Sequence, residues 1–119
     1  MSNLSFDLVV CVLTVHWLAD FCLQTHEQAQ NKSKSFGALI RHCGTYTLAL
    51  LVAFGFKGQT FIGWGIANGM LHTFIDAITC HITSSLYQKE RYHDFFVTIG
   101  ADQLLHCISL LGTLCMMGE

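Results

Sequence analysis

Three pairs of histidine and aspartate, in which the two members of each pair are four positions apart, are the residues of this sequence best suited to chemistry. The pairs are His16 with Asp20, His72 with Asp76 and, in reversed order, Asp102 with His106. Residues four positions apart lie on one face of an α-helix, one turn above the other. Each pair therefore directs a carboxylate and an imidazole to the same side of a helix.

All three pairs lie within strongly apolar stretches of the chain. Such groups are costly to bury unless they meet each other, a metal ion or water. We therefore predict that the helices pack with these faces converging on one site, and that the site binds metal. A fourth histidine near the start of another apolar stretch joins the set. The predicted ligands are His16, Asp20, His42, His72, Asp76, Asp102 and His106.

Mixed imidazole and carboxylate ligands indicate a transition metal. They suit Zn best, with Mn, Fe or Ni as alternatives to it, and they suit Mg or Ca less well. Seven ligands serve one divalent ion, or two ions bridged by a carboxylate. Gln24, Asn68 and Gln103 are expected to orient ligands or substrate, and Tyr46 to donate a proton or a hydrogen bond. Lys34 and Arg41, which are cationic, are expected at the mouth of the site.

Four apolar segments must position these residues. They span residues 4–25, 36–56, 60–86 and 95–117, and each is long enough for the roughly 20 helical residues that cross a bilayer. Apolar residues make up 52% of the chain and charged residues only 12%, about half the share that is usual in soluble domains. We predict an all-α, membrane-embedded four-helix bundle that forms one domain over residues 1–119. A soluble four-helix bundle is the alternative.

The loops predict an orientation in the bacterial inner membrane. Lysine and arginine fall mainly in the first loop and in the loop after residue 86, whereas Lys57 lies on the opposite side. The positive-inside rule then places these two loops in the cytoplasm and both termini outside. In this topology the reversed order of Asp102 and His106 matches the reversed direction of the last span. The three aspartates would form a layer nearer the cytoplasm, with His42 close to it, and the other three histidines a deeper layer.

The six cysteines do not predict disulfides. They lie in or near the apolar segments without any C-x-x-C spacing, and buried cysteine usually behaves as a small hydrophobe. Thiolate ligation of the metal is disfavoured too, because Cys43 directly follows His42 and would turn roughly 100° away from its face. The N-terminal segment carries polar residues and no preceding basic residue, so we interpret it as a retained span. No basic surface suggests nucleic-acid binding.

A run of motifs resembles a known family. The string from His16 to Thr25, HWLADFCLQT, is similar to the opening signature of small bacterial and phage membrane proteins that share the domain of unknown function 3307. The resemblance continues through Lys32 or Lys34, His42 and Tyr46, then through residues 68–76 and 95–106. It implies a short multi-span protein and no established activity. A more distant likeness, of pattern only, is to inner-membrane proteins described as metal-dependent hydrolases.

Three functions remain open from the sequence. The first is a membrane-embedded metal-dependent hydrolase that acts on an ester or phosphoester, such as an anionic lipid, from the cytoplasmic side or the inner leaflet. The second is a homo-oligomeric transporter or channel for a metal ion or proton, which would need a polar path to the outer side. The third is a non-catalytic interaction protein in which the polar groups only hold helices together.

Overall fold

A computed structural model describes residues 4–117, and this part of the chain contains helices and no strands. Helix α1 covers Phe6–Trp17 and continues without a break as the π-helical segment η1, Leu18–Cys22. Helix α2 covers His26–Asn31, and α3 covers Phe36–Phe54, followed by the 3₁₀ turn η2, Gly55–Lys57. Helix α4 covers Gln59–Gln88, and α5 covers Tyr92–Met117. The four predicted helical segments are therefore present, with bounds close to those expected.

Local sequence signals explain where the helices begin. The hydroxyl groups of Ser5 and Ser35 accept hydrogen bonds from the first turns of α1 and α3. Thr25 and Gln28 form a reciprocal capping box that starts α2. The sequence had predicted a loop from Thr25 to Ser35, so α2 corrects that prediction. The loop predicted between residues 86 and 95 is shorter than expected, because α4 and α5 leave only residues 89–91 between them.

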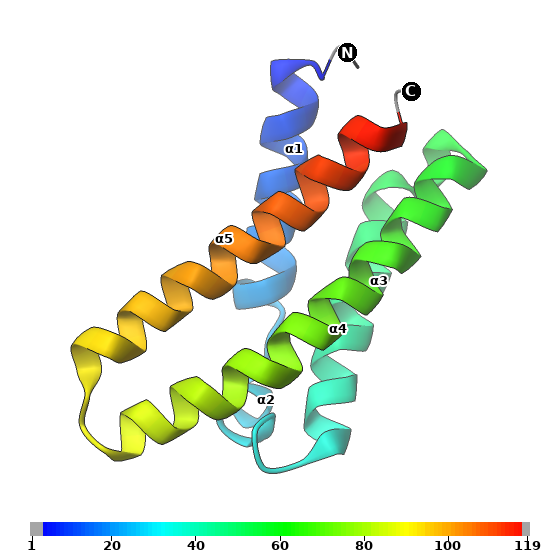
Figure 1. The fold of residues 1–119 in the computed structure, drawn as a ribbon. Coiled ribbons are helices and arrows are strands. Elements are labelled where there is room, and N and C mark those ends of the chain that lie inside the picture. The colour runs from blue at the N-terminus through cyan, green and yellow to red at the C-terminus, as the bar shows by residue number, and fades with distance from the viewer. Residues whose placement is uncertain (1–3, 118–119) are drawn as a thin grey trace.

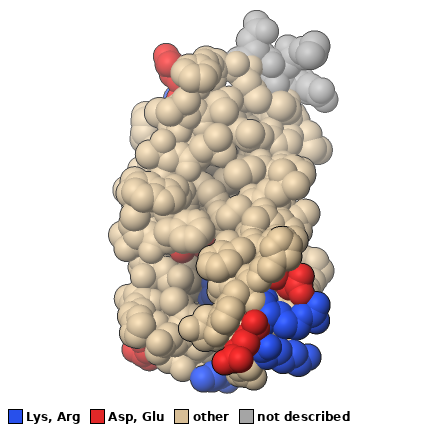
Figure 2. Space-filling view, turned by 90° about the vertical axis from the view of Figure 1, so that its left-hand side faces the viewer, with Lys and Arg blue, Asp and Glu red and all other residues tan. Residues whose placement is uncertain are grey.

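The helices run alternately up and down (Figure 1). Both ends of the described chain lie at one end of the molecule, with the α3–α4 connection, whereas α2 and the α4–α5 turn lie at the other end. We call this second end the basic end, because Lys and Arg side chains gather there in Figure 2. Helix α4 packs between α3 and α5, and α1 packs against α3 and, less extensively, α5. The elongated molecule measures 45 × 26 × 20 Å.

The distribution of polarity is inverted relative to that of a soluble domain. Nine polar or charged side chains are buried, whereas 26 large apolar side chains are exposed among the described residues. The uncharged surface covers the middle of the molecule in Figure 2. An apolar surface of this extent is typical of proteins that face lipid or partners.

Two of the four predicted spans are long and apolar enough to cross a membrane, namely Phe36–Lys57 and Tyr92–Met117. The first predicted span does not qualify as one regular helix, because α1 ends after 12 residues where η1 begins. Helix α4 has the length, with 30 residues, but its polar side chains lower its apolar character. The four-span topology therefore stays a prediction.

The apolar core fills the half of the molecule near the chain termini. Trp64 is its largest member, and its indole N–H donates to the carbonyl oxygen of Leu110 at 3.2 Å, tying α4 to α5. Phe54 packs edge-on against the same indole. The buried core residues of this half are Val12, Ala19, Tyr46, Leu50, Phe54, Trp64, Leu110 and Leu114. The polar cluster lies immediately on the other side of Tyr46.

Candidate metal centre

The structure brings the seven predicted ligands together at the centre of the molecule. Each is at most 8% exposed, although they come from α1, η1, α3, α4 and α5. Three groups of side chains have ligand atoms close enough to hold a metal ion. The groups are Asp20–His42–His72, Asp20–Asp102–His106 and Cys43–His72–Asp76.

The first group has the tightest geometry. The Nε2 atom of His42 lies 3.0 Å from Oδ1 of Asp20 and 3.3 Å from Nε2 of His72. Nε2 of His72 lies 3.6 Å from Oδ1 of Asp20, so the three atoms form a triangle. Oδ2 of Asp76 lies 3.4 Å from Nε2 of His42 and 4.0 Å from Nε2 of His72. Tetrahedral zinc with ligands at about 2.0–2.1 Å separates them by about 3.3–3.4 Å. The four side chains therefore fit one small transition-metal ion with modest adjustment.

The second group lies beside the first and shares Asp20 with it. Nε2 of His106 lies 3.2 Å from Oδ2 of Asp102, yet it makes no hydrogen bond within the described structure. An unpartnered, buried imidazole nitrogen next to a carboxylate oxygen is suited to metal ligation. Asp20 is thus the one carboxylate placed to bridge two ions.

The third group includes a thiol that the sequence analysis had set aside. Cys43 is buried, and its sulfur lies within 4.8 Å of ligand atoms of His72 and Asp76. The expected turn of roughly 100° away from His42 does occur along α3. It nevertheless leaves Cys43 facing α4, because α4 packs along that side of α3.

Gln103 connects three of the predicted ligands. Its amide nitrogen donates to Oδ2 of Asp20 and to Oδ2 of Asp102, each at 3.0 Å. Its amide oxygen must therefore be the acceptor that faces Nε2 of His16 at 2.8 Å. This arrangement suits the orienting role that the sequence predicted for Gln103.

The same network defines the state of His16. Because Nε2 donates to Gln103, Nδ1 of a neutral His16 ring is an acceptor, and the Tyr46 hydroxyl donates to it at 2.8 Å. Both ring nitrogens of His16 thus have protein partners, and His16 belongs to none of the three groups. Tyr46 also stacks on the His72 ring, with centroids 3.8 Å apart. His16 and Tyr46 therefore hold the cluster in place from its deep side.

Lys32 is a member of the polar cluster that the sequence analysis did not single out. Its ammonium nitrogen lies 3.2 and 3.4 Å from the two carboxylate oxygens of Asp76. Burial lowers the pKa of Lys32, but the carboxylates of Asp76 and Asp20 outweigh that effect and raise the pKa above its ordinary value. The only indication in the sequence was that Lys32 falls among the motifs that resemble those of the family. The charge was expected in a solvated loop, and α2 instead directs it inward.

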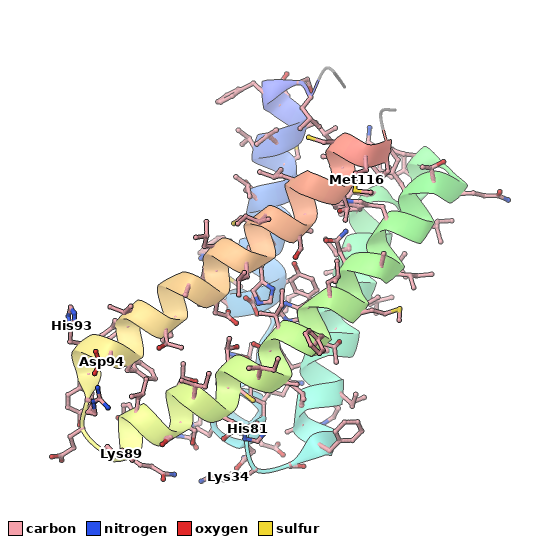
Figure 3. The ribbon with its side chains drawn as sticks, in the orientation of Figure 1. Lys34, His81, Lys89, His93, Asp94 and Met116 are labelled. Atoms are coloured by element: carbon pink, nitrogen blue, oxygen red, sulfur yellow. The ribbon has the colours of Figure 1, made fainter. Side chains whose placement is uncertain are left out.

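Of the two residues expected at the mouth of the site, Lys34 lines the cavity and Arg41 does not. Arg41 is exposed and pairs with Glu27 at 3.5 Å, and Lys34 lies at the basic end, where it lines the mouth of the cavity described below (Figure 3). The remaining histidines, His26, His81 and His93, are exposed. They belong to α2, α4 and α5.

Two predicted orienting residues, Gln24 and Asn68, make no hydrogen bond to a predicted ligand within the described residues. Asn68 donates to the carbonyl oxygen of Trp64 and to the hydroxyl of Thr113, both at 2.9 Å, so its amide ties α4 to α5 within the apolar half. Gln24 follows η1 and lines the same cavity as Asp20 and Asp76. Thr79, in contrast, donates to Oδ1 of Asp102 at 2.5 Å, a contact that the sequence analysis did not predict.

A cavity of about 590 Å³ connects the cluster with the basic end. Asp20, Asp76 and Asp102 contribute to its inner wall, and Lys32 and Gln103 lie beside them. Phe21, Phe95 and Ile99 supply apolar wall. The carboxylates are therefore reachable from one side, whereas the three deeper histidines do not line the cavity.

Comparison with protein families supports one affiliation. The family model described as "Protein of unknown function (DUF3307)" matches residues 8–117. The chain belongs to the DUF3307 family. This membership confirms the resemblance drawn from the sequence motifs, and it covers every member of the polar cluster. Neither the curated proteins nor the solved structures include a match to the chain. The DUF3307 match gives no support to the more distant likeness to metal-dependent hydrolases.

Proposed function

We propose that this protein is an integral membrane protein with a divalent metal centre, and that it hydrolyses an ester or phosphoester reached from the cytoplasmic side or the inner leaflet. The observation that carries the proposal is the triangle of Asp20, His42 and His72. Its sides of 3.0, 3.3 and 3.6 Å bracket the separation of about 3.3–3.4 Å that a tetrahedral zinc ion sets between its ligands.

Charge balance supports a divalent ion. Three buried carboxylates, those of Asp20, Asp76 and Asp102, meet one ammonium group, that of Lys32. In their ionised form they leave two negative charges uncompensated in a low-dielectric interior, which is strongly unfavourable. One divalent ion neutralises both. Zinc suits the ligand set best, and Mn, Fe or Ni fit it as well.

Access from one side favours an enzyme over a transporter. The cavity reaches the carboxylates from the basic end, but the half beyond Tyr46 is filled by the apolar core around Trp64. A transporter or channel would need polar groups that continue to the other end. A purely structural cluster, in turn, would not need a cavity of this size against its carboxylates.

The inverted polarity supports membrane insertion. Exposed apolar side chains surround a buried polar centre, an arrangement that water would disfavour and lipid would accept. With four spans in the bacterial inner membrane, the basic end would face the cytoplasm, as the positive-inside rule requires. The cavity would then open towards the cytoplasm.

The residues have distinct roles in the proposed reaction. A bound divalent ion supplies Lewis acidity and makes water a better nucleophile. His42, His72 and Asp76 would hold one ion, and Asp20 would bridge to a second ion bound by Asp102 and His106. Gln103 orients the two carboxylates that it contacts. In hydrolysis the oxygen of water bonds to phosphorus or acyl carbon, the ester bond breaks, and the leaving alkoxide takes up a proton.

Metal analysis of the protein purified in detergent tests the proposal. We expect one or two divalent ions per chain, and loss of metal in His42→Ala and His72→Ala. His93→Ala is the matched control, because His93 is exposed beside the α4–α5 turn (Figure 3). Hydrolysis of p-nitrophenyl acetate and bis-p-nitrophenyl phosphate should stop with chelator and return with zinc. Metal-free protein whose thermal stability is unchanged by zinc or by chelator would contradict the metal centre.

A further inference from the structure

The cavity lies across a seam between η1 and α5. Phe21 on η1 and Phe95 and Ile99 on α5 line it from opposite sides. Within the described residues η1 packs against α1 and α3 and has no backbone-level packing with α5. The side chain of Gln103 is the polar link across this seam, through its hydrogen bonds to Asp20 and His16. A molecule in the cavity therefore has room beside η1 on the side facing α5.

The walls of the cavity differ in character from its inner end to its mouth. The inner end carries the carboxylates, Thr79 and the Lys32 ammonium. The outer wall is mixed. Its aromatic side includes Tyr87, whose ring lies 5.4 Å from that of Phe95, and its polar side includes Ser33, Ser84 and Gln88. The aromatic side of the wall offers apolar contact to a small molecule whose polar group lies at the inner end. The occupant should accordingly be an amphiphile with its polar group innermost.

The charges at the inner end identify the polar group. With both proposed divalent ions bound, the positive charge of the ions and of Lys32 would exceed the negative charge of the three carboxylates, so the inner end would attract an anion. Lys32 remains partly accessible, with 19% of its side chain exposed. Lys34 adds a positive charge at the mouth. Lysine and bound metal are a common combination for phosphate recognition.

Lipid is the source that the surface favours. Phe21 is 46% exposed and lines the cavity at the same time, so the cavity wall continues into the apolar outer surface of η1. Leu18, at the start of η1, and Leu23, directly after its end, are also more than 40% exposed. An acyl chain lying along η1 would pass from the cavity to the bilayer without crossing a charged rim.

We infer that the substrate is a phosphate-bearing lipid. Its phosphate binds at the metal centre and Lys32, and its chains leave between η1 and α5 along Phe21 and Phe95. The inference rests on the proposed metal centre and adds the substrate class and its route.

Titration calorimetry of the zinc-loaded protein in a neutral detergent tests the inference. The probes are dihexanoyl phosphatidic acid, glycerol 3-phosphate with the same phosphate but no chains, and dihexanoyl phosphatidylcholine, whose phosphate is capped by choline. We expect phosphatidic acid to bind at least about tenfold more tightly than glycerol 3-phosphate, because its chains bury apolar surface. It should also bind more tightly than phosphatidylcholine, which lacks the second phosphate charge.

Paired variants separate the two ends of the cavity. Phe95→Ala should weaken phosphatidic acid binding about tenfold and leave glycerol 3-phosphate unchanged. Phe96→Ala is its control, because Phe96 is the neighbouring residue, is 67% exposed and does not line the cavity. Lys32→Gln should weaken both phosphate probes, Lys32→Arg should restore them in part, and Lys89→Gln at the same end should not change them.

Metal content, measured on the same samples, distinguishes failure of the inference from failure of the proposed function. If the protein holds zinc but binds glycerol 3-phosphate as tightly as phosphatidic acid, the substrate is a soluble phosphoester and the lipid inference is wrong. Equal effects of Phe95→Ala and Phe96→Ala would also overturn it. If the zinc-loaded protein binds neither phosphate probe, the phosphate assignment is wrong while the metal centre stands. If the protein holds no metal, both proposals fall.

Discussion

Asp20 and His42 are 22 positions apart in the chain, and their side chains meet at 3.0 Å between Oδ1 and Nε2 at the buried centre of the molecule. Asp20 lies on the π-helical turn of η1, whereas His42 lies on α3. π-Helical turns are rare and often occur at functional sites, since they place a side chain where a regular helix would not. The contact joins η1 to α3 within the candidate metal centre.

Asp20→Asn should release more metal than any other single carboxylate substitution. Asp20 belongs to two of the three candidate groups, whereas Asp102 belongs to one. We expect loss of all bound metal in Asp20→Asn and partial loss in Asp102→Asn, measured by plasma mass spectrometry. Asp94→Asn is the control, because Asp94 is at the surface and pairs with Arg91. Equal metal content in the two test variants would argue against a bridging Asp20.

Gln103→Leu should lower metal affinity by about 10- to 100-fold, the usual effect of removing a group that orients ligands. Leucine keeps the approximate volume but leaves Asp20, Asp102 and His16 without their shared amide. Competition with a zinc chelator measures the change. Gln59→Leu, at the opposite end of the molecule, should leave the affinity unchanged. An unaltered affinity in Gln103→Leu would assign the amide to helix packing alone.

Lys32→Gln should make the fold more dependent on metal. The raised pKa of Lys32 keeps its ammonium charged throughout the neutral range, where it compensates one carboxylate. Without it, removal of metal leaves Asp76 with no cationic partner, and we expect a further loss of about 1–3 kcal/mol. The measurement is the fall in Tm on addition of chelator, compared between Lys32→Gln, Lys89→Gln and the unaltered protein. Equal falls in all three would contradict the compensating role of Lys32.

Gly69→Ala should destabilise the packing of α3 against α4. A Cβ atom at Gly69 would lie 2.1 Å from the hydroxyl oxygen of Thr47, a side chain that hydrogen-bonds to the carbonyl of Cys43. Overpacking of this kind costs about 1–3 kcal/mol, which thermal unfolding in detergent would show. Gly63→Ala is the control, since its Cβ would meet no atom within 4 Å. The double variant Gly69→Ala with Thr47→Ala should recover part of the loss.

Most of the helices could be predicted from the sequence. Apolar segments of about 20 residues between polar breaks are helical for a local reason, because backbone groups in an apolar environment must bond within their own segment. The four-residue spacing of His72 and Asp76 also has a local meaning, since it places both side chains on one face of α4. Helix α2 and the π-turn were not predicted, because a short capped turn and a single inserted residue leave weak signals in composition.

Only the tertiary structure decided which polar groups meet. The sequence predicted seven ligands without distinguishing them, whereas packing gave both nitrogens of His16 to Tyr46 and Gln103 and turned Cys43 towards His72. Packing also directed Lys32 onto Asp76, across 44 positions of the chain. Spacing along a helix determines the face on which a residue lies. The partner that it meets depends on how neighbouring helices are rotated and displaced, and this follows from the packing of all side chains together.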